Sequence, residues 1–153
     1  MSCERYKIKS RPGEFGPYYW IDSAKSDLNK GRRWLESDQT AHWTPNELST
    51  AVYWAVQAWL MASDIPLDNG NGWASMYMQF YSEAPKNLVK IANTSLAYAS
   101  YLEFQIQGAD DYQESIPMSE WRLRAAETVQ MVERVINEIE KDIDNILNIP
   151  EKQ

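Results

Sequence analysis

The stretch from Ala125 to Ile146, AAETVQMVERVINEIEKDIDNI, carries the most regular pattern in the chain. Its apolar residues alternate between spacings of four and three positions, which is the heptad pattern of a helix that buries one narrow stripe. The pattern predicts a long helix that begins near Ser119 and ends before Pro150. Its partner is either the rest of the same chain or a second copy. The stripe consists of Ala125, Val129, Val132, Ile136, Ile139, Ile143 and Ile146.

A second helix is predicted to begin at Thr44 and to end before Pro66, because proline cannot continue a helix. Its start is well marked, with Thr44 as the N-cap, Pro45 at the first helical position and Glu47 at the third. Residues 48–60 are apolar around nearly the whole circumference. A helix of this kind lies at the centre of a domain or in an interface.

Apolar periodicity and helix-breaking residues predict three further helices, at about 19–36, 73–82 and 85–108. No strand pattern occurs between them. The sequence therefore predicts an all-α fold, a four-helix up-and-down bundle with one short extra helix. This bundle forms a single domain at 19–149. Residues 1–18 are predicted to form an extended N-terminal arm, because Pro and Gly interrupt them.

Composition and charge narrow the setting in which the protein works. The formal net charge is −7, which disfavours binding to the phosphate backbone of nucleic acids. Cys3 is the only cysteine, so no internal disulfide can form, as is typical of proteins in a reducing cytosol. The sequence shows neither a signal peptide nor a run of about 18 apolar residues. We therefore expect a cytoplasmic protein that does not enter a membrane.

The sequence lacks the residues that most catalytic and metal sites require. His42 is the only histidine, whereas zinc sites need several Cys or His ligands and di-iron bundles need Glu-x-x-His on two helices. A serine or cysteine nucleophile normally needs a histidine base as well. The favoured interpretation of His42 is a polar loop residue before a helix. The sequence therefore predicts no metal, no cofactor and no catalytic residue.

Aromatic and amide side chains suggest a different kind of site, a ligand pocket between helices. Seven tryptophans and nine tyrosines are many for 153 residues. Aromatic walls with a few polar groups suit planar ligands, and pockets in helical bundles lie between the helices. The residues predicted to bind a ligand are Tyr53, Gln57, Tyr98, Gln107 and Tyr112. The alternative is that Gln57 fixes a core contact and that the tyrosines serve packing.

The run Ala51-Val52-Tyr53-Trp54-Ala55-Val56-Gln57-Ala58-Trp59-Leu60 resembles the second helix of HEPN domains, the higher eukaryotes and prokaryotes nucleotide-binding family. The pair Asp111-Tyr112, followed by a long last helix, fits the same pattern, and the likeness covers roughly residues 20–145. It implies a four- or five-helix bundle that is often dimeric. Many members are RNases or partners of nucleotidyltransferases in toxin–antitoxin and defence systems. The nuclease members carry Arg, four to six residues, then His, but here Gln107 and Tyr112 occupy those places.

These observations lead to one main hypothesis and two alternatives. The main hypothesis is a non-catalytic, HEPN-like binding or assembly module that forms a homodimer. A nucleotidyltransferase is the kind of protein partner that the resemblance implies. The first alternative is a protein or enzyme that binds a nucleotide or another small molecule in a pocket between helices. The second is an RNA-binding protein or RNase of a toxin–antitoxin or defence system, which the net charge disfavours.

Overall fold

A computed structural model describes residues 3–66, 72–106 and 116–147. Every regular element within these ranges is helical, which confirms the all-helical prediction. None of the described helices has the length and apolar character needed to span a bilayer. The elements in chain order are α1 (Cys3–Lys7), α2 (Pro17–Trp34), the short 3-10 helix η1 (Ala41–Trp43), α3 (Thr44–Ala62), α4 (Gly72–Glu83), α5 (Lys86–Ile106) and α6 (Met118–Leu147).

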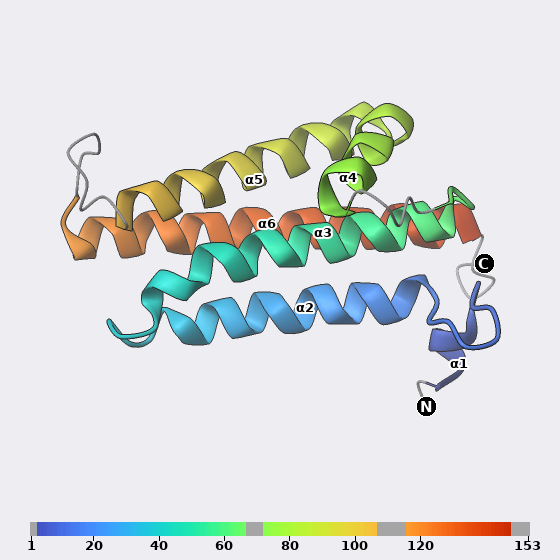
Figure 1. The fold of residues 1–153 in the computed structure, drawn as a ribbon, viewed down its shortest axis with the longest axis horizontal. Helices are drawn as coiled ribbons and strands as arrows, with labels where there is room; N and C mark the ends of the chain where they lie inside the picture. The colour runs from blue at the N-terminus through green and yellow to red at the C-terminus, as the bar shows by residue number, and fades with distance from the viewer. Residues whose placement is uncertain (1–2, 67–71, 107–115, 148–153) are drawn as a thin grey trace.

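The helices α3 and α6 form the centre of the molecule. They pack against one another, and each also packs against both α2 and α5. As a result α2 and α5 lie on opposite sides of the central pair (Figure 1). The long helices α2, α3, α5 and α6 run in alternating directions along the same axis (Figure 1). The short helix α4 packs against α3 and the neighbouring α5.

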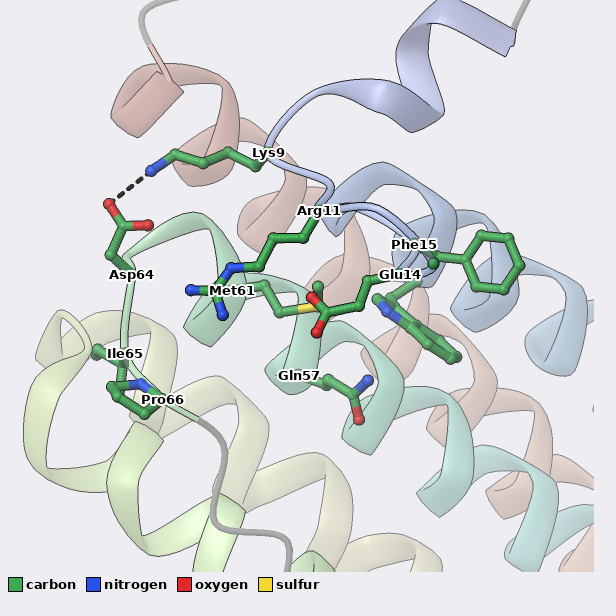
Figure 2. Close-up of a pocket in the computed structure, with 11 residues that line it drawn as sticks. Lys9, Arg11, Glu14, Phe15, Gln57, Met61, Asp64, Ile65 and Pro66 are labelled. Atoms are coloured by element: carbon green, nitrogen blue, oxygen red, sulfur yellow. Dashed lines mark hydrogen bonds and ion pairs between the residues drawn. The ribbon is translucent and has the colours of Figure 1, made fainter.

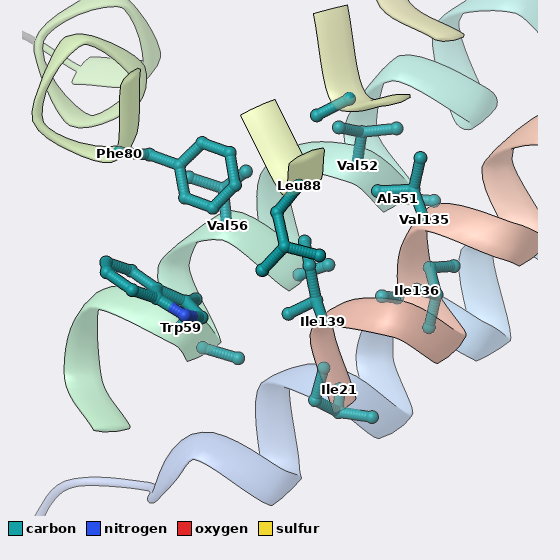
Figure 3. Close-up of a cluster of buried hydrophobic side chains, with 14 of the residues drawn as sticks. Ile21, Ala51, Val52, Val56, Trp59, Phe80, Leu88, Val135, Ile136 and Ile139 are labelled. Carbon is teal, nitrogen blue, oxygen red and sulfur yellow. The ribbon is translucent and has the colours of Figure 1, made fainter. Parts of the chain in front are cut away.

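The stripe predicted from the last helix is buried against the rest of the same chain. Val132, Ile136, Ile139 and Ile143 of α6 are fully buried or nearly so. Figure 3 shows Ile136 and Ile139 facing Ile21 of α2 and side chains of α3. Of the two partners that the sequence left open for this helix, the structure therefore shows the chain itself. The stripe ends before Ile146, which is 40% exposed.

The sequence predicted an extended N-terminal arm, but part of this arm is helical. Residues 3–7 form α1, and α2 begins at Pro17, two residues before the predicted start. A five-residue helix is marginal by itself, since most helical stability in proteins comes from packing. Here Tyr6 and the following Ile8 pack against the main core, and Arg5 forms an ion pair with Glu140 of α6. These distant contacts explain why local sequence signals did not reveal α1.

Candidate functional site

The outer side of α5 carries an exposed row of residues spaced as on the face of a paired helix. The spacings from Lys90 to Phe104 are four, three, four and three positions. This is the same heptad spacing as on α6, but here every member is exposed to solvent. Tyr101 and Phe104 expose 59% and 56% of their surfaces, and Tyr98 beside the row exposes 48%. We call Lys90, Thr94, Ala97, Tyr101 and Phe104 the outer row of α5.

The opposite side of α5 faces the core. Leu88, Ala92, Ala99 and Leu102 are buried there, and the buried Ser95 donates a hydrogen bond to the carbonyl of Ala92. Near the end of the helix, the indole N–H of Trp121 donates a 2.9 Å hydrogen bond to the carbonyl of Leu102. The helix therefore carries apolar side chains on its inner side and exposed aromatic rings on the second half of its outer side. The inner side is covered by the chain itself, whereas the aromatic rings of the outer row remain open.

Tyr53, which was predicted to line a pocket with Tyr98, instead contacts α4. Its ring stacks on Trp73 with centroids 5.2 Å apart and meets Tyr77 edge-on at 6.1 Å. Trp73 also meets Trp54 of α3 edge-on at 5.0 Å. These ring contacts hold α4 against α3.

The predicted pocket residues are not brought to one place by the described part of the chain. Tyr98 lies on the exposed side of α5, whereas Gln57 lines a cleft formed with the N-terminal segment. Gln107 and Tyr112 fall outside the described residues.

The cleft has a volume of about 590 Å³ and lies between the N-terminal segment and the end of α3 (Figure 2). Its apolar lining comes from Phe15, Trp20, Met61, Ile65 and Pro66, and its polar lining from Lys9, Arg11, Glu14, Gln57 and Asp64, with Gly13 completing the wall. Sequence reasoning identified only Gln57 among these residues. The glycines and prolines of the arm indicated turns there, but not that the turns fold back onto α3.

Gly16 is the residue that lets the N-terminal segment fold back. A side chain at this position would place its Cβ 2.1 Å from the carbonyl oxygen of Ile8, which is far inside a steric clash. The amide of Gly16 also donates a 3.3 Å hydrogen bond to the carbonyl of Tyr6. The segment between α1 and α2 is therefore closed into a compact turn that forms one wall of the cleft.

An ion pair joins the two walls of the cleft. The Lys9 Nζ lies 2.5 Å from the Asp64 Oδ2 (Figure 2). Both residues adopt left-handed backbone angles, with φ of 61° and 59°, and they are the two non-glycine residues with positive φ in the described chain. Left-handed backbone in non-glycine residues is costly and clusters at functional sites. The two residues with left-handed backbone are therefore also the two residues whose ion pair connects the walls of the cleft.

A half-buried polar cluster fixes α1 on α2 and α6. Glu140 accepts hydrogen bonds from Arg5 at 2.6 Å and Lys25 at 2.8 Å. Burial alone would raise the pKa of Glu140, but the hydrogen bonds and charges of Lys25 and Arg5 lower it below the usual value of 4.5. The Arg5 guanidinium also lies 4.4 Å from the ring centroid of Tyr18. Burial, and then a hydrogen bond donated to Asp144, raises the pKa of the Tyr18 phenol.

His42, the only histidine, is not among the residues that line the cleft. His42 is exposed in η1, with its ring centroid 5.0 Å from that of Trp43. Within the described ranges, no group of three or more His, Cys, Asp or Glu side chains could hold a metal ion.

Comparison with known proteins finds no matching family model, no matching curated protein and no matching solved structure.

Proposed function

We propose that this chain is a cytoplasmic, non-catalytic binding module that assembles as a homodimer through the outer row of α5. We also propose that α2, α3, α5 and α6 make up a four-helix up-and-down bundle, and that this bundle is HEPN-like. The observation that carries it is the exposed heptad spacing of the outer row. Large exposed apolar patches mark interaction surfaces, and tyrosine and phenylalanine are enriched in the cores of interfaces.

The composition of the outer row favours a second copy of α5 as the partner. In an antiparallel pair related by a two-fold axis, each residue meets its counterpart from the other end of the row. With the axis at Ala97, the small side chain permits close approach of the two helices. Lys90 of each chain then lies opposite Phe104 of the other. An ammonium group over an aromatic ring is favourable, so the polar and aromatic ends of the row complement each other.

A protein partner such as a nucleotidyltransferase would compete for the same row, and this alternative rests on the HEPN resemblance alone. RNA binding draws little support from the row, because Lys90 is its single cation. Binding to a phosphate backbone uses several cations together. The homodimer is therefore the form of the proposal that the exposed residues support best.

Sedimentation velocity over a range of protein concentrations tests the homodimer. We expect a reversible dimer for the natural sequence and a monomer for the double variant Tyr101→Lys, Phe104→Lys. The variant dimer would bury unpaired ammonium groups and would set one of them against Lys90 of the other chain. Both positions are exposed, so the variant should keep its helical circular dichroism and its thermal midpoint. The natural sequence sedimenting as a monomer up to its solubility limit would refute the proposal.

The matched control is Ile146→Lys, which also adds a positive charge at an exposed apolar position of α6. Ile146 lies 25 residues beyond Trp121, the residue that contacts the end of α5. This corresponds to about 37 Å along the helix, at 1.5 Å per residue. The control should therefore dimerise like the natural sequence. Equal loss of dimer in the control would show that added charge, not the outer row, is responsible.

A further inference from the structure

We propose that the cleft between the N-terminal segment and α3 binds a small zwitterion with an apolar side chain, either a free amino acid or a short peptide. This inference is independent of the homodimer, because the outer row of α5 contributes none of the lining residues. The volume of about 590 Å³ lies within the range of small-molecule sites, which is roughly 300–1,000 Å³.

The cleft is lined by equal numbers of positive and negative side chains, and this balance indicates which class of ligand fits it. Two cations, Lys9 and Arg11, and two carboxylates, Glu14 and Asp64, line it. Lys9 and Asp64 neutralise each other in their ion pair. A nucleotide or another polyanion would be repelled by the two carboxylates as much as it is attracted by the two cations. Its binding would therefore gain little electrostatic free energy in the cleft. A ligand with one positive and one negative group matches the cleft better.

Arg11 and Glu14 are the charges left for such a ligand. Within the described part of the chain, neither side chain forms an ion pair or a hydrogen bond. Both belong to the segment that Gly16 folds back, and Figure 2 shows both side chains extending toward α3. Arg11 supplies donors for a carboxylate, and Glu14 supplies an acceptor for an ammonium group. Charge-assisted hydrogen bonds of this kind are stronger than neutral ones.

The end of α3 adds two further features to the site. Met61 lies in the last turn of the helix, close to the residues of the N-terminal segment that line the cleft. Gln57, one turn earlier, can donate to a carboxylate or accept from an ammonium group. The side chains of Met61 and Ile65 provide an apolar surface beside these polar groups. The cleft therefore offers contacts for both charges and for an apolar side chain.

Isothermal titration calorimetry with matched probes tests the inference on the full chain. The probes are leucine, leucyl-leucine, N-acetylleucine, leucinamide and adenosine monophosphate. We expect saturable binding of leucine or leucyl-leucine, and the tighter of the two distinguishes a free amino acid from a short peptide. N-acetylleucine lacks the ammonium group and leucinamide lacks the carboxylate. Each should bind about tenfold more weakly than leucine, since each loses one charged contact.

Two variants assign the charges to their partners. Arg11→Gln should weaken leucine about tenfold but leave leucinamide unchanged, because leucinamide has no carboxylate to lose a contact. Glu14→Gln should weaken leucine but leave N-acetylleucine unchanged. Arg33→Gln and Glu36→Gln, exposed positions near the other end of α2, serve as controls and should change nothing. Absence of saturable zwitterion binding, tighter binding of adenosine monophosphate, or equal weakening of all probes would overturn the inference.

Discussion

The indole N–H of Trp59 donates a 2.7 Å hydrogen bond to the Asp142 carboxylate, which joins the two central helices α3 and α6. The same indole ring meets Phe80 of α4 edge-on, with centroids 5.6 Å apart. One side chain therefore links three helices at the end of the molecule where the cleft lies. Because α3 also carries Gln57 and Met61, the position of the cleft depends on this contact between α3 and α6.

Replacing Trp59 by phenylalanine keeps an aromatic ring but removes the hydrogen bond. We expect the free energy of unfolding to fall by about 1–2 kcal/mol, because Asp142 keeps some access to water after losing its donor. A double-mutant cycle with Asp142→Ala, followed by urea unfolding, isolates this contact from the lost ring volume. Strictly additive losses in the cycle would mean that the hydrogen bond contributes nothing.

The stripe on α6 offers a comparison between a buried and an exposed isoleucine. Ile139→Ala should destabilise the fold by about 2–5 kcal/mol, since the site is fully enclosed and a cavity would remain. Ile146→Ala should cost less than about 1 kcal/mol, because its side chain is already partly in water. Thermal and urea unfolding of the two variants measure the difference. Similar losses at both positions would contradict the packing described for α6.

The cluster around Glu140 predicts a specific pH dependence of stability. Because its pKa is lowered in the folded state, the charged carboxylate stabilises the fold fully above the unfolded value of about 4.5. This contribution disappears as the pH falls through the lower folded pKa. The natural sequence should therefore be more stable than Glu140→Gln at neutral pH, and the gap should narrow in acid. Urea unfolding of both proteins at neutral pH and in acid measures this difference in stability. A difference that does not change with pH would argue against the ion pairs.

Lys90 tests the antiparallel register of the proposed dimer. Lys90→Gln should weaken dimerisation by about 0.5–1 kcal/mol, since it removes the charge that faces the partner's Phe104 ring. Lys86→Gln is the control, because Lys86 lies four residues before the row begins. Concentration-dependent sedimentation gives both dissociation constants. A larger effect of Lys86 than of Lys90 would favour a different register.

Helices and their inner faces were predictable because they depend on local patterns. The spacing from Val132 to Ile143 predicted the buried stripe, and α3 begins close to the predicted position. The N-cap prediction was wrong, because Trp43 is the N-cap and Thr44 is the first helical residue. The Thr44 hydroxyl instead donates a 3.2 Å hydrogen bond to the carbonyl of Gly31. The η1 turn at 41–43 was missed, since three residues carry no periodicity. Local signals could also not reveal that the stripe packs within the chain, because this depends on how α2, α3 and α5 surround it.

The candidate sites were less predictable because they are made by distant segments. The cleft forms where residues 9–20 meet 57–66. The close approach of Gly16 to Ile8 folds the N-terminal segment back, and the ion pair between Lys9 and Asp64 joins it to the end of α3. Tyr53 was a reasonable pocket residue, but Trp73 of α4 covers its ring. The outer row of α5 has a readable spacing in the sequence. Its exposure became evident only once the opposite side of α5 was seen packed on α3 and α6.

The most direct test of the central claim is whether two α5 helices lie face to face. We would place a single spin label at Ser100→Cys, an exposed position beside the outer row, in a Cys3→Ser background and measure dipolar coupling between chains. Because packed helices lie about 8–10 Å apart, we predict one intermolecular distance below about 30 Å. A label at Asn29→Cys on α2, on the opposite side of the central pair, should give a longer distance. Dimers that show no short distance at Ser100, or a shorter one at Asn29, would contradict assembly through α5.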